Sequence, residues 1–250
     1  MGSGVPAAGP PLFLVAVGEL TGPAVTLTGP EGRHAAVVRR LRVGERADVT
    51  DGAGILAEGV VASVGQDSVT LDVRALHTVP PPEQRLAVAQ ALPKGDRGEL
   101  AVELMTEVGV DTIIPWSAER SITRWQAERG EKALGRWRST AREAAKQSRR
   151  PWLPEVAGLA TTPALAKRAV AAARAVVLDA DALPKLHELP LPERGELLLI
   201  VGPEGGISPA ERAALREAGA LEARLGPTVL RTSTAGAAAA AILLSRAGRW

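Results

Sequence analysis

The sequence has no cysteine and no tyrosine, and only one phenylalanine and five tryptophans. The lack of cysteine excludes disulfides, thiolate metal ligands and a cysteine nucleophile, so we expect a cytoplasmic protein and not a disulfide-rich secreted scaffold. Aromatic residues are too few for an RNA-binding platform of the RRM type. No apolar run approaches the roughly 20 residues that a membrane span needs. His34, His77 and His187 show no metal-ligand spacing, so we expect neither a membrane protein nor a metal site.

The composition and the linker signals predict two folded segments. Apolar residues make up 46% of 250 residues and the net charge is only +2, so the chain as a whole is not disordered. Residues 1–11 lack the order of a signal peptide and are predicted to be a loose end. Consecutive prolines mark residues 77–84 as a linker. The predicted domains are therefore residues 12–76 and 85–250.

Residues 12–76 have the pattern of a small β-barrel. Apolar or alternating runs, with Asp51-Gly52 as a turn signal, predict its strands. These are Leu12–Val17, a strand from Val25, Ala47–Thr50, Ile55–Val64 and Ser68–Val73. One helix is expected at Arg33–Leu41.

Strands and helices alternate in residues 85–250, which predicts an α/β sheet. The expected strands are Leu86–Leu92, Asp111–Pro115, Val176–Leu178, Leu197–Val201 and Leu221–Leu225. The expected helices are Glu99–Val108, Glu131–Arg150 and Thr234–Arg246.

A glycine-rich turn follows the apolar strand Leu197–Val201. Its tetrapeptide Gly-Pro-Glu-Gly occurs at residues 202–205 and also at 29–32, so only the context distinguishes the two copies. After the second copy, Ser208 is a predicted N-cap, Pro209 suits the first helical position and Glu211 completes a capping box. Ligands of α/β sheets bind beyond the carboxyl ends of strands, and glycine lets them approach the backbone. The alternative, a plain tight connection, stays open.

A second loop, residues 225–235, also runs from a strand end into a helix. Thr232 or Ser233 is expected to cap this helix, and Arg231 at the junction offers five N–H donors. In the alternative interpretation, Arg231 pairs with a carboxylate and Leu230 belongs to the core. Two Gly-Pro loops at neighbouring strand ends favour a ligand site.

These loops resemble the SPOUT signature of the ribosomal RNA small subunit methyltransferase E family. The resemblance is carried by Ile200–Ser208, Leu225-Gly226-Pro227 and Leu230-Arg231-Thr232, and extends to Gln90–Arg97, Thr106–Val110, Ile113–Pro115, Glu119–Ser121, Glu143 and Gln147–Arg149. Arg33-His34, Val38, Leu41-Arg42, Gly44 and Asp51-Gly52 resemble its PUA-like amino-terminal domain. The match covers nearly the whole chain. It departs at Ser233, where the family usually has Glu, and at Gly236 with the following alanines, and it is loose over Val176–Leu183.

The resemblance implies an α/β fold in which a PUA-like β-barrel precedes a SPOUT domain with a deep trefoil knot. It also implies a homodimer that transfers a methyl group from S-adenosyl-L-methionine to N3 of a uridine in 16S RNA of the small ribosomal subunit. The residues that match the cofactor site are Leu178, Ile200, Gly202, Pro203, Glu204, Gly205, Leu225, Gly226, Val229, Leu230 and Thr232. Arg231 is the catalytic candidate, because a cation stabilises the anion formed when N3 loses its proton. The sulfonium methyl is already activated, so this transfer requires no metal.

Basic residues form two clusters. Five arginines and one acid lie between Arg33 and Arg46, and Arg138, Arg142, Lys146 and Arg149 follow each other at helical spacing. Such clusters neutralise phosphates, although a solvated helix face is the commoner meaning of one stripe. The predicted RNA-facing residues are Arg33, Arg39, Arg42, Lys94, Arg97, Arg120, Arg124 and Arg149.

Two other functions stay open. One is a SPOUT enzyme that methylates a ribose 2′-hydroxyl or a transfer-RNA guanine. The other is a non-catalytic RNA-binding module with a degenerate pocket, for which Ser233 is the argument. A nucleotide hydrolase is disfavoured, because neither glycine-rich loop ends in the Lys-Ser/Thr of a P-loop.

Overall fold

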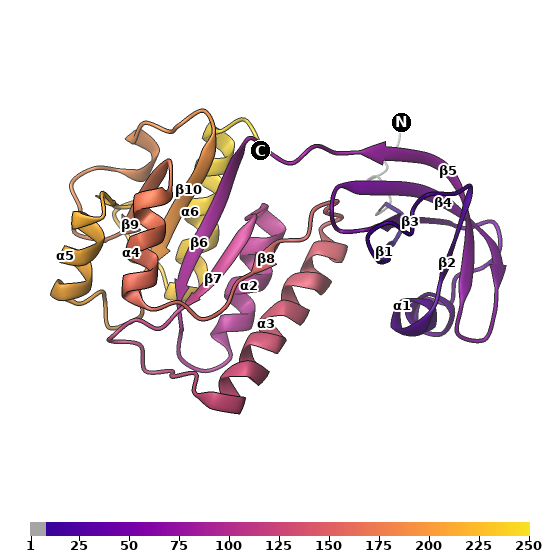
Figure 1. The fold of residues 1–250 in the computed structure, drawn as a ribbon, viewed down its shortest axis with the longest axis horizontal. Coiled ribbons are helices and arrows are strands. Elements are labelled where there is room, and N and C mark those ends of the chain that lie inside the picture. The colour runs from indigo at the N-terminus through magenta and orange to yellow at the C-terminus, as the bar shows by residue number, and fades with distance from the viewer. Residues whose placement is uncertain (1–8) are drawn as a thin grey trace, which may run out of the picture. The chain divides into compact units, whose positions relative to one another are not determined.

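The computed structural model describes residues 9–250, which form two compact units (Figure 1). Unit 1 comprises the described residues up to 81 together with 146–153, and unit 2 comprises 82–145 and 154–250. Each unit has its own hydrophobic core. The predicted loose end lies outside the described residues as far as residue 8.

Unit 1 is built on a five-stranded sheet in the order β1-β3-β4-β5-β2. Its strands are β1 (Leu12–Leu14), β2 (Ala24–Leu27), β3 (Arg46–Thr50), β4 (Ile55–Val64) and β5 (Val69–Thr78). β1 pairs parallel to β3 and the other pairs are antiparallel. Phe13, Leu27 and Leu71 are fully buried in its core. β5 extends into the predicted linker, so residues 79–83 join it to the next strand.

The helix expected at Arg33–Leu41 differs from the prediction in start and type. A short helix α1 (Gly29–Arg33) begins with Pro30 in its first turn, where proline is tolerated. A π-helix (His34–Val38) continues it, and Arg40 adopts a left-handed backbone conformation. Gly32 lies so close to the Asp67 carbonyl that a Cβ would be 2.5 Å from that oxygen. The first Gly-Pro-Glu-Gly copy is therefore a packing element of unit 1.

Residues 146–153 belong to unit 1 although they are distant in sequence. Lys146 forms a buried 3.0 Å ion pair with Glu31. The Trp152 indole donates a 2.9 Å hydrogen bond to the Val79 carbonyl. Gly54 has a φ of 102°, and a Cβ there would be 2.5 Å from the Trp152 ring. No local sequence signal predicts this long-range association.

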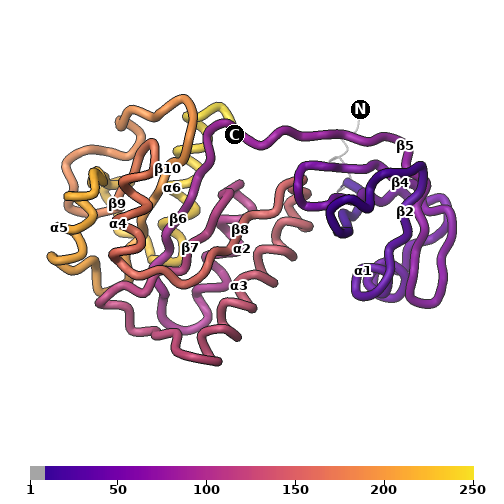
Figure 2. The backbone as a smooth tube through the Cα atoms, in the orientation of Figure 1, coloured from indigo at the N-terminus to yellow at the C-terminus, as the bar shows by residue number. Residues whose placement is uncertain are grey.

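Unit 2 contains a parallel six-stranded sheet in the order β11-β9-β10-β6-β7-β8. Figure 2 shows the path of the chain through β9, β10, β6, β7 and β8. Its strands are β6 (Gln84–Ala91), β7 (Thr112–Trp116), β8 (Glu155–Val156), β9 (Arg174–Leu178), β10 (Gly195–Val201) and β11 (Leu221–Ala223). The predicted α/β class is confirmed. The five strands expected here all form, with shifted ends, whereas the two-residue β8 was not predicted.

Helices cover both faces of this sheet, as Figure 1 shows. They are α2 (Arg97–Val108), α3 (Ala127–Gln147), α4 (Thr162–Ala171), α5 (Pro209–Glu217) and α6 (Thr232–Arg246), with a 3-10 turn at Leu186–Glu188. α2, α3 and α6 contribute to one apolar core, and α4 and α5 to the other. Because β10 is buried on both faces, it is apolar at nearly every position. No helix within residues 9–250 is long and apolar enough to cross a membrane.

Candidate functional site

A cavity of about 510 Å³ lies in unit 2 at the carboxyl ends of β9, β10 and β11. Three loops form its wall, each following one of these strands. The lining residues lie in segments 178–181, 201–207 and 225–232, with Arg212 and Ala235 added from α5 and α6. This is the edge of a parallel sheet at which ligands bind, so both glycine-rich loops converge on one site.

The loop after β10 has little room for larger side chains. A Cβ at Gly202 would lie 2.7 Å from the Ile207 side chain, and Gly206 has a φ of 73°. The Gly206 N–H closes the turn onto the Pro203 carbonyl at 2.9 Å. The predicted capping box is confirmed: the Ser208 hydroxyl accepts from the Glu211 N–H, and the Glu211 carboxylate accepts from the Ser208 N–H.

The loop after β11 leads into α6, whose N-cap is Arg231. The prediction that Thr232 or Ser233 caps this helix is wrong, because α6 begins earlier and both lie inside its first turn. The Arg231 carbonyl accepts from the Thr234 and Ala235 N–H groups, both at 2.9 Å. The Ser233 hydroxyl is buried and has no hydrogen-bond partner in the described part of the chain.

Arg231 and Leu230 are exposed at the cavity. Leu230 keeps 40% of its surface exposed and lines the cavity, so it is not a core residue. The Arg231 side chain forms no ion pair or hydrogen bond within residues 9–250. The interpretation that Arg231 is neutralised by a carboxylate is therefore wrong. Its guanidinium is an uncompensated cation beside the cavity.

The loop after β9 adds acidic residues that the motifs did not indicate. Asp179 and Asp181 line the cavity, and so does Arg212. The Asp179 carboxylate, whose side chain is 8% exposed, pairs with Arg212 and accepts a 3.0 Å hydrogen bond from the Asp181 N–H. These residues directly follow a buried parallel strand, and that position is the signal that could have found them.

Most of the residues predicted for the cofactor line this cavity. They are Leu178, Gly202, Pro203, Glu204, Leu225, Gly226, Val229, Leu230 and Thr232. Ile200 and Gly205 do not. Side chains alternate along a strand, and Ile200 points into the core shared with α4 and α5. Gly205 packs against Arg120, where a Cβ would lie 3.3 Å from the Arg120 carbonyl oxygen.

Three of the predicted RNA-facing residues lie on loops: Lys94 follows β6, and Arg120 and Arg124 follow β7. Arg97, also predicted, is the first residue of α2. The Lys94 N–H donates to the Glu204 carboxylate at 3.2 Å. Arg120 donates to the Gly205 carbonyl at 3.3 Å, and Arg124 donates to the carbonyls of its own loop.

The predicted basic stripe on α3 is used largely for internal contacts. Arg138 donates to the Val156 carbonyl at 3.2 Å, and Lys146 pairs with Glu31. Arg149 pairs with Asp48, although burial still raises the pKa of that carboxyl above its ordinary value. Arg138, Arg142 and Arg149 nevertheless stay exposed, so the solvated helix face and the phosphate-binding stripe both stay open as interpretations.

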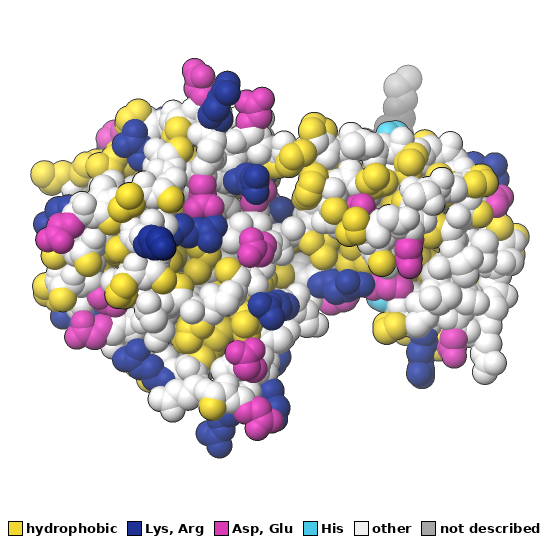
Figure 3. All heavy atoms as spheres, viewed as in Figure 1, with side chains coloured by type: hydrophobic (Ala, Val, Ile, Leu, Met, Phe, Trp, Pro, Cys, Tyr) yellow, Lys and Arg dark blue, Asp and Glu magenta, His cyan; other side chains and the backbone are white. Residues whose placement is uncertain are grey.

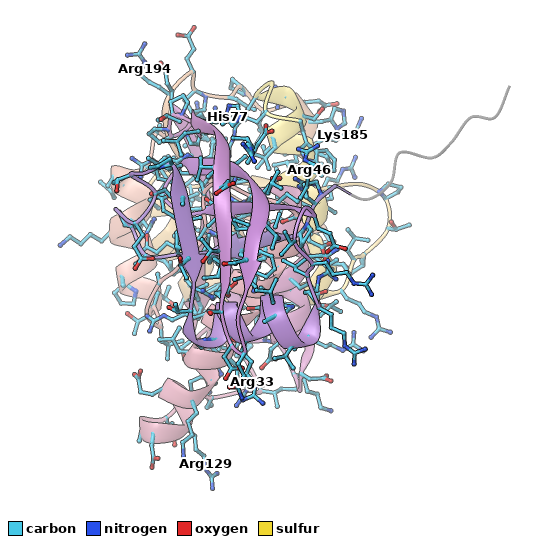
Figure 4. All side chains as sticks on the ribbon, turned by 90° about the vertical axis from the view of Figure 1, so that its right-hand side faces the viewer. Arg33, Arg46, His77, Arg129, Lys185 and Arg194 are labelled. Atoms are coloured by element: carbon cyan, nitrogen blue, oxygen red, sulfur yellow. The ribbon has the colours of Figure 1, made fainter. Side chains whose placement is uncertain are left out.

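The remaining predicted RNA-facing residues, Arg33, Arg39 and Arg42, are exposed on unit 1. Figure 4 shows Arg33 and Arg46 at opposite ends of the unit 1 sheet, so this cluster is spread out. On the face drawn in Figure 3, basic and acidic side chains are interspersed. Within the described residues, no group of three or more His, Asp and Glu is arranged to hold a metal ion.

Two family models match the chain. An RNA methyltransferase domain matches residues 80–244, and an RNA methyltransferase PUA domain matches residues 27–74. A curated relative from Mycobacterium bovis, ribosomal RNA small subunit methyltransferase E, is 46% identical over 96% of this chain and 93% of its own. The protein of the same name from Bacillus subtilis is 31% identical over 85% of this chain and 86% of its own.

Solved structures with bound S-adenosylmethionine are also similar. A methyltransferase from Legionella pneumophila has a TM-score of 0.85 and 26% identity, covering 96% of this chain and 98% of its own. A ribosomal RNA small subunit methyltransferase E from Neisseria gonorrhoeae has a TM-score of 0.82 and 25% identity, covering 95% and 98%.

Proposed function

The chain belongs to the ribosomal RNA small subunit methyltransferase E family, and we propose that its target is N3 of a uridine in 16S RNA. It is an S-adenosylmethionine-dependent methyltransferase that acts on ribosomal RNA. The observation that carries the proposal is the convergence of both family motifs on one cavity, beside an Arg231 that has no side-chain partner within residues 9–250.

The cavity suits S-adenosylmethionine. Its volume falls within the roughly 300–1,000 Å³ of small-molecule sites. Leu225, Val229 and Leu230 supply apolar surface for an adenine ring, and Gly202 lets the ligand approach the backbone. The carboxylates of Asp181 and Glu204 also line it, and they complement a ligand that carries an ammonium and a sulfonium group. We propose that these residues hold the cofactor.

When bound, the cofactor supplies an already activated methyl group. Uridine N3 is a weakly acidic imide that must lose its proton to become a nucleophile. We propose that Arg231 stabilises the resulting anion, because a positioned cation acts where negative charge develops. The amino terminus of α6, which begins at the next residue, adds a positive partial charge. The protein must also align the acceptor nitrogen with the methyl group. Because the methyl group is already activated, this transfer requires no metal.

We propose that residues 12–76, together with 146–153, dock RNA as a PUA-like barrel, and that residues 85–250 without that segment are the catalytic domain. Of the predicted linker 77–84, residues 79–83 connect β5 to β6. The PUA match over residues 27–74 supports the first of these proposals. Exposed Arg33, Arg39 and Arg42 would contact RNA phosphates there. Near the cavity, RNA phosphates would be contacted by Lys94, Arg97, Arg120 and Arg124. Arg149 would contact a phosphate through those N–H groups of its guanidinium that are not bonded to Asp48. We also propose a trefoil knot near α6, which packs against α2, β6 and β10.

We further propose that the enzyme is a homodimer. Leu183 and Val229 are 88% and 83% exposed, which is costly for apolar side chains unless they are covered. Their loops run side by side, linked by the bridge between Lys185 and Arg224. Its substrate, ribosomal RNA of the small subunit, implies action in the cytoplasm.

A radiolabelled methyl-transfer assay tests the proposed target. Unmodified small subunits, free 16S RNA and transfer RNA are offered, and the products are digested to nucleosides. We expect label in 3-methyluridine from subunits or 16S RNA. Label in a ribose or in guanine would assign another SPOUT specificity, and bound cofactor without transfer would indicate the degenerate binding module.

Replacing Arg231 tests its role within that reaction. Arg231→Ala should lower kcat by about a hundredfold or more, the size seen when one charge-stabilising donor is removed. The Kd for S-adenosylmethionine should stay near the wild-type value. Arg194→Ala is the matched control, because it removes an exposed arginine just before the amino end of β10, whereas the cavity lies at the carboxyl end of that strand. An unchanged kcat for Arg231→Ala would exclude it from the mechanism.

A further inference from the structure

Glu211 is a buried carboxylate, 6% exposed, whose contacts reach beyond its own helix. One oxygen accepts from the Ser208 N–H at 3.2 Å, which completes the capping box of α5. The other accepts from the Glu119 N–H and from the Thr162 hydroxyl, both at 2.8 Å. Within residues 9–250 no lysine or arginine pairs with it. These hydrogen-bond donors therefore offset most of the free-energy cost of burying the charge of Glu211.

The Glu119 N–H belongs to the loop that follows β7, and this loop is held at several points. The Arg124 guanidinium donates to the Ala118 carbonyl at 2.8 Å and also to the Glu119 carbonyl. The Thr123 hydroxyl donates to the Pro93 carbonyl at 2.7 Å. The loop, residues 118–124, is therefore held by contacts from the β6 loop, from α5 and from within itself.

Arg120 stands on this loop beside the cavity wall. It is exposed, and one of its five N–H donors reaches the Gly205 carbonyl at 3.3 Å. Gly205 has little room for a side chain, because an added Cβ would lie 3.3 Å from both the Arg120 Cβ and its carbonyl oxygen. The position of Arg120 therefore depends on the backbone of residues 118–120, and Glu211 fixes that backbone from inside.

We propose that Glu211 is a positioning residue for RNA: its carboxylate holds the 118–124 loop so that Arg120 meets an RNA phosphate beside the methyl-transfer cavity. A capping role alone would need only the contacts with Ser208. The oxygen bonded to Glu119 and Thr162 does nothing for α5 and instead joins three elements. The proposal rests on the proposed function, because it takes RNA as the ligand of Arg120.

The role of Glu211 is tested by the salt dependence of RNA binding. A residue that only stabilises the fold would leave this salt dependence unchanged. Each phosphate contact contributes about 0.7–0.9 to the slope of log Kd against log salt concentration. The probe is 16S RNA, with the full-length protein. The variants are Glu211→Gln, Arg120→Ala and the double variant. Ser208→Ala is the control, because it removes the side-chain cap of α5 and leaves the Glu119 contact in place.

We expect Glu211→Gln and Arg120→Ala each to flatten the slope by about one phosphate contact, and the double variant to flatten it no further. Ser208→Ala should keep the wild-type slope. The Glu119 amide should also exchange about three- to tenfold faster in Glu211→Gln, because an amide oxygen accepts a weaker hydrogen bond than a carboxylate oxygen does. If Glu211→Gln does not fold, Thr162→Val, which removes one donor to the same oxygen, should flatten the slope in the same direction.

Three results would overturn the inference: a wild-type slope in Glu211→Gln, slopes that add in the double variant, or unchanged exchange at Glu119. The inference would also be overturned if the wild-type protein bound no 16S RNA. Methyl transfer by the wild-type protein is measured in parallel. Its absence, with the expected slopes present, would refute the proposed reaction and leave the positioning role standing.

Discussion

Arg249, just beyond α6, is a position outside the cavity at which substitution should lower the stability of the fold. Its guanidinium forms two hydrogen bonds with the Asp111 carboxylate, at 2.6 and 2.9 Å, and others reach the Gln84 and Gly109 carbonyls. These contacts fix the end of the helix whose first residues line the cavity. The two side chains are 23% and 12% exposed, so the pair is mostly but not fully buried.

Arg249→Met removes the cation and leaves the Asp111 carboxylate with the Leu86 N–H, at 2.8 Å, among its remaining donors. Breaking a buried pair costs about 3–5 kcal/mol. Partial exposure reduces this, and we expect a loss of about 2–4 kcal/mol in the free energy of unfolding. Urea denaturation followed by circular dichroism measures this loss.

Asp111→Asn and the double variant complete a double-mutant cycle. In this cycle, removing both charges should cost less free energy of unfolding than the sum of the two single changes. A loss below about 0.5 kcal/mol for Arg249→Met, or additive losses, would refute this reasoning.

Two further predictions concern a cavity glycine and a buried carboxyl. Gly202→Ala should lose about 1–3 kcal/mol of stability and weaken S-adenosylmethionine binding, because its Cβ would overlap the Ile207 side chain. Gly226→Ala, where no protein atom lies within 4 Å of the added Cβ, should keep wild-type stability, and equal losses by urea denaturation would contradict this. Burial raises the pKa of Asp48 above 3.8, so the native state binds its proton more tightly than the unfolded state does. The contribution of Asp48 to the free energy of unfolding is therefore fully present below pH 3.8, and it is lost as the pH rises through the pKa of the native state. The difference in unfolding free energy between the wild type and Asp48→Asn should fall as the pH rises over this range. A rise would show that the ion pair with Arg149 outweighs the effect of burial on the pKa of Asp48.

Features set by local sequence could be predicted well. The strand Leu197–Val201 forms because an apolar run of this length suits a sheet covered on both faces. The capping box of Ser208 and Glu211 forms because its partners are three residues apart. Capping at the start of α6 was predicted wrongly, because the cap depends on where the chain turns before Thr232.

Features set by tertiary contacts could not be predicted. The assignment of residues 146–153 to unit 1 depends on partners about a hundred positions away, such as Glu31 for Lys146. Such contacts also pair Lys146 with Glu31 and Arg149 with Asp48, so two of the four cations of the basic stripe have carboxylate partners that the sequence does not reveal. Motif matching found most of the cavity lining, but it included Ile200, whose side chain is on the other face of the sheet. It missed Asp179, which lies where the family match is loose, and Arg212, which lies outside the matched motifs.

A crystal structure of the protein with S-adenosylmethionine tests the account most directly. We expect the cofactor in the cavity between the 202–206 and 225–232 loops, with its methyl group facing the side where Arg231 lies. Soaked Arg231→Ala crystals should show the same cofactor position, because Arg231 is assigned to the acceptor base. Cofactor bound at any other place, or no binding at saturating concentration, would contradict the assignment of the cavity.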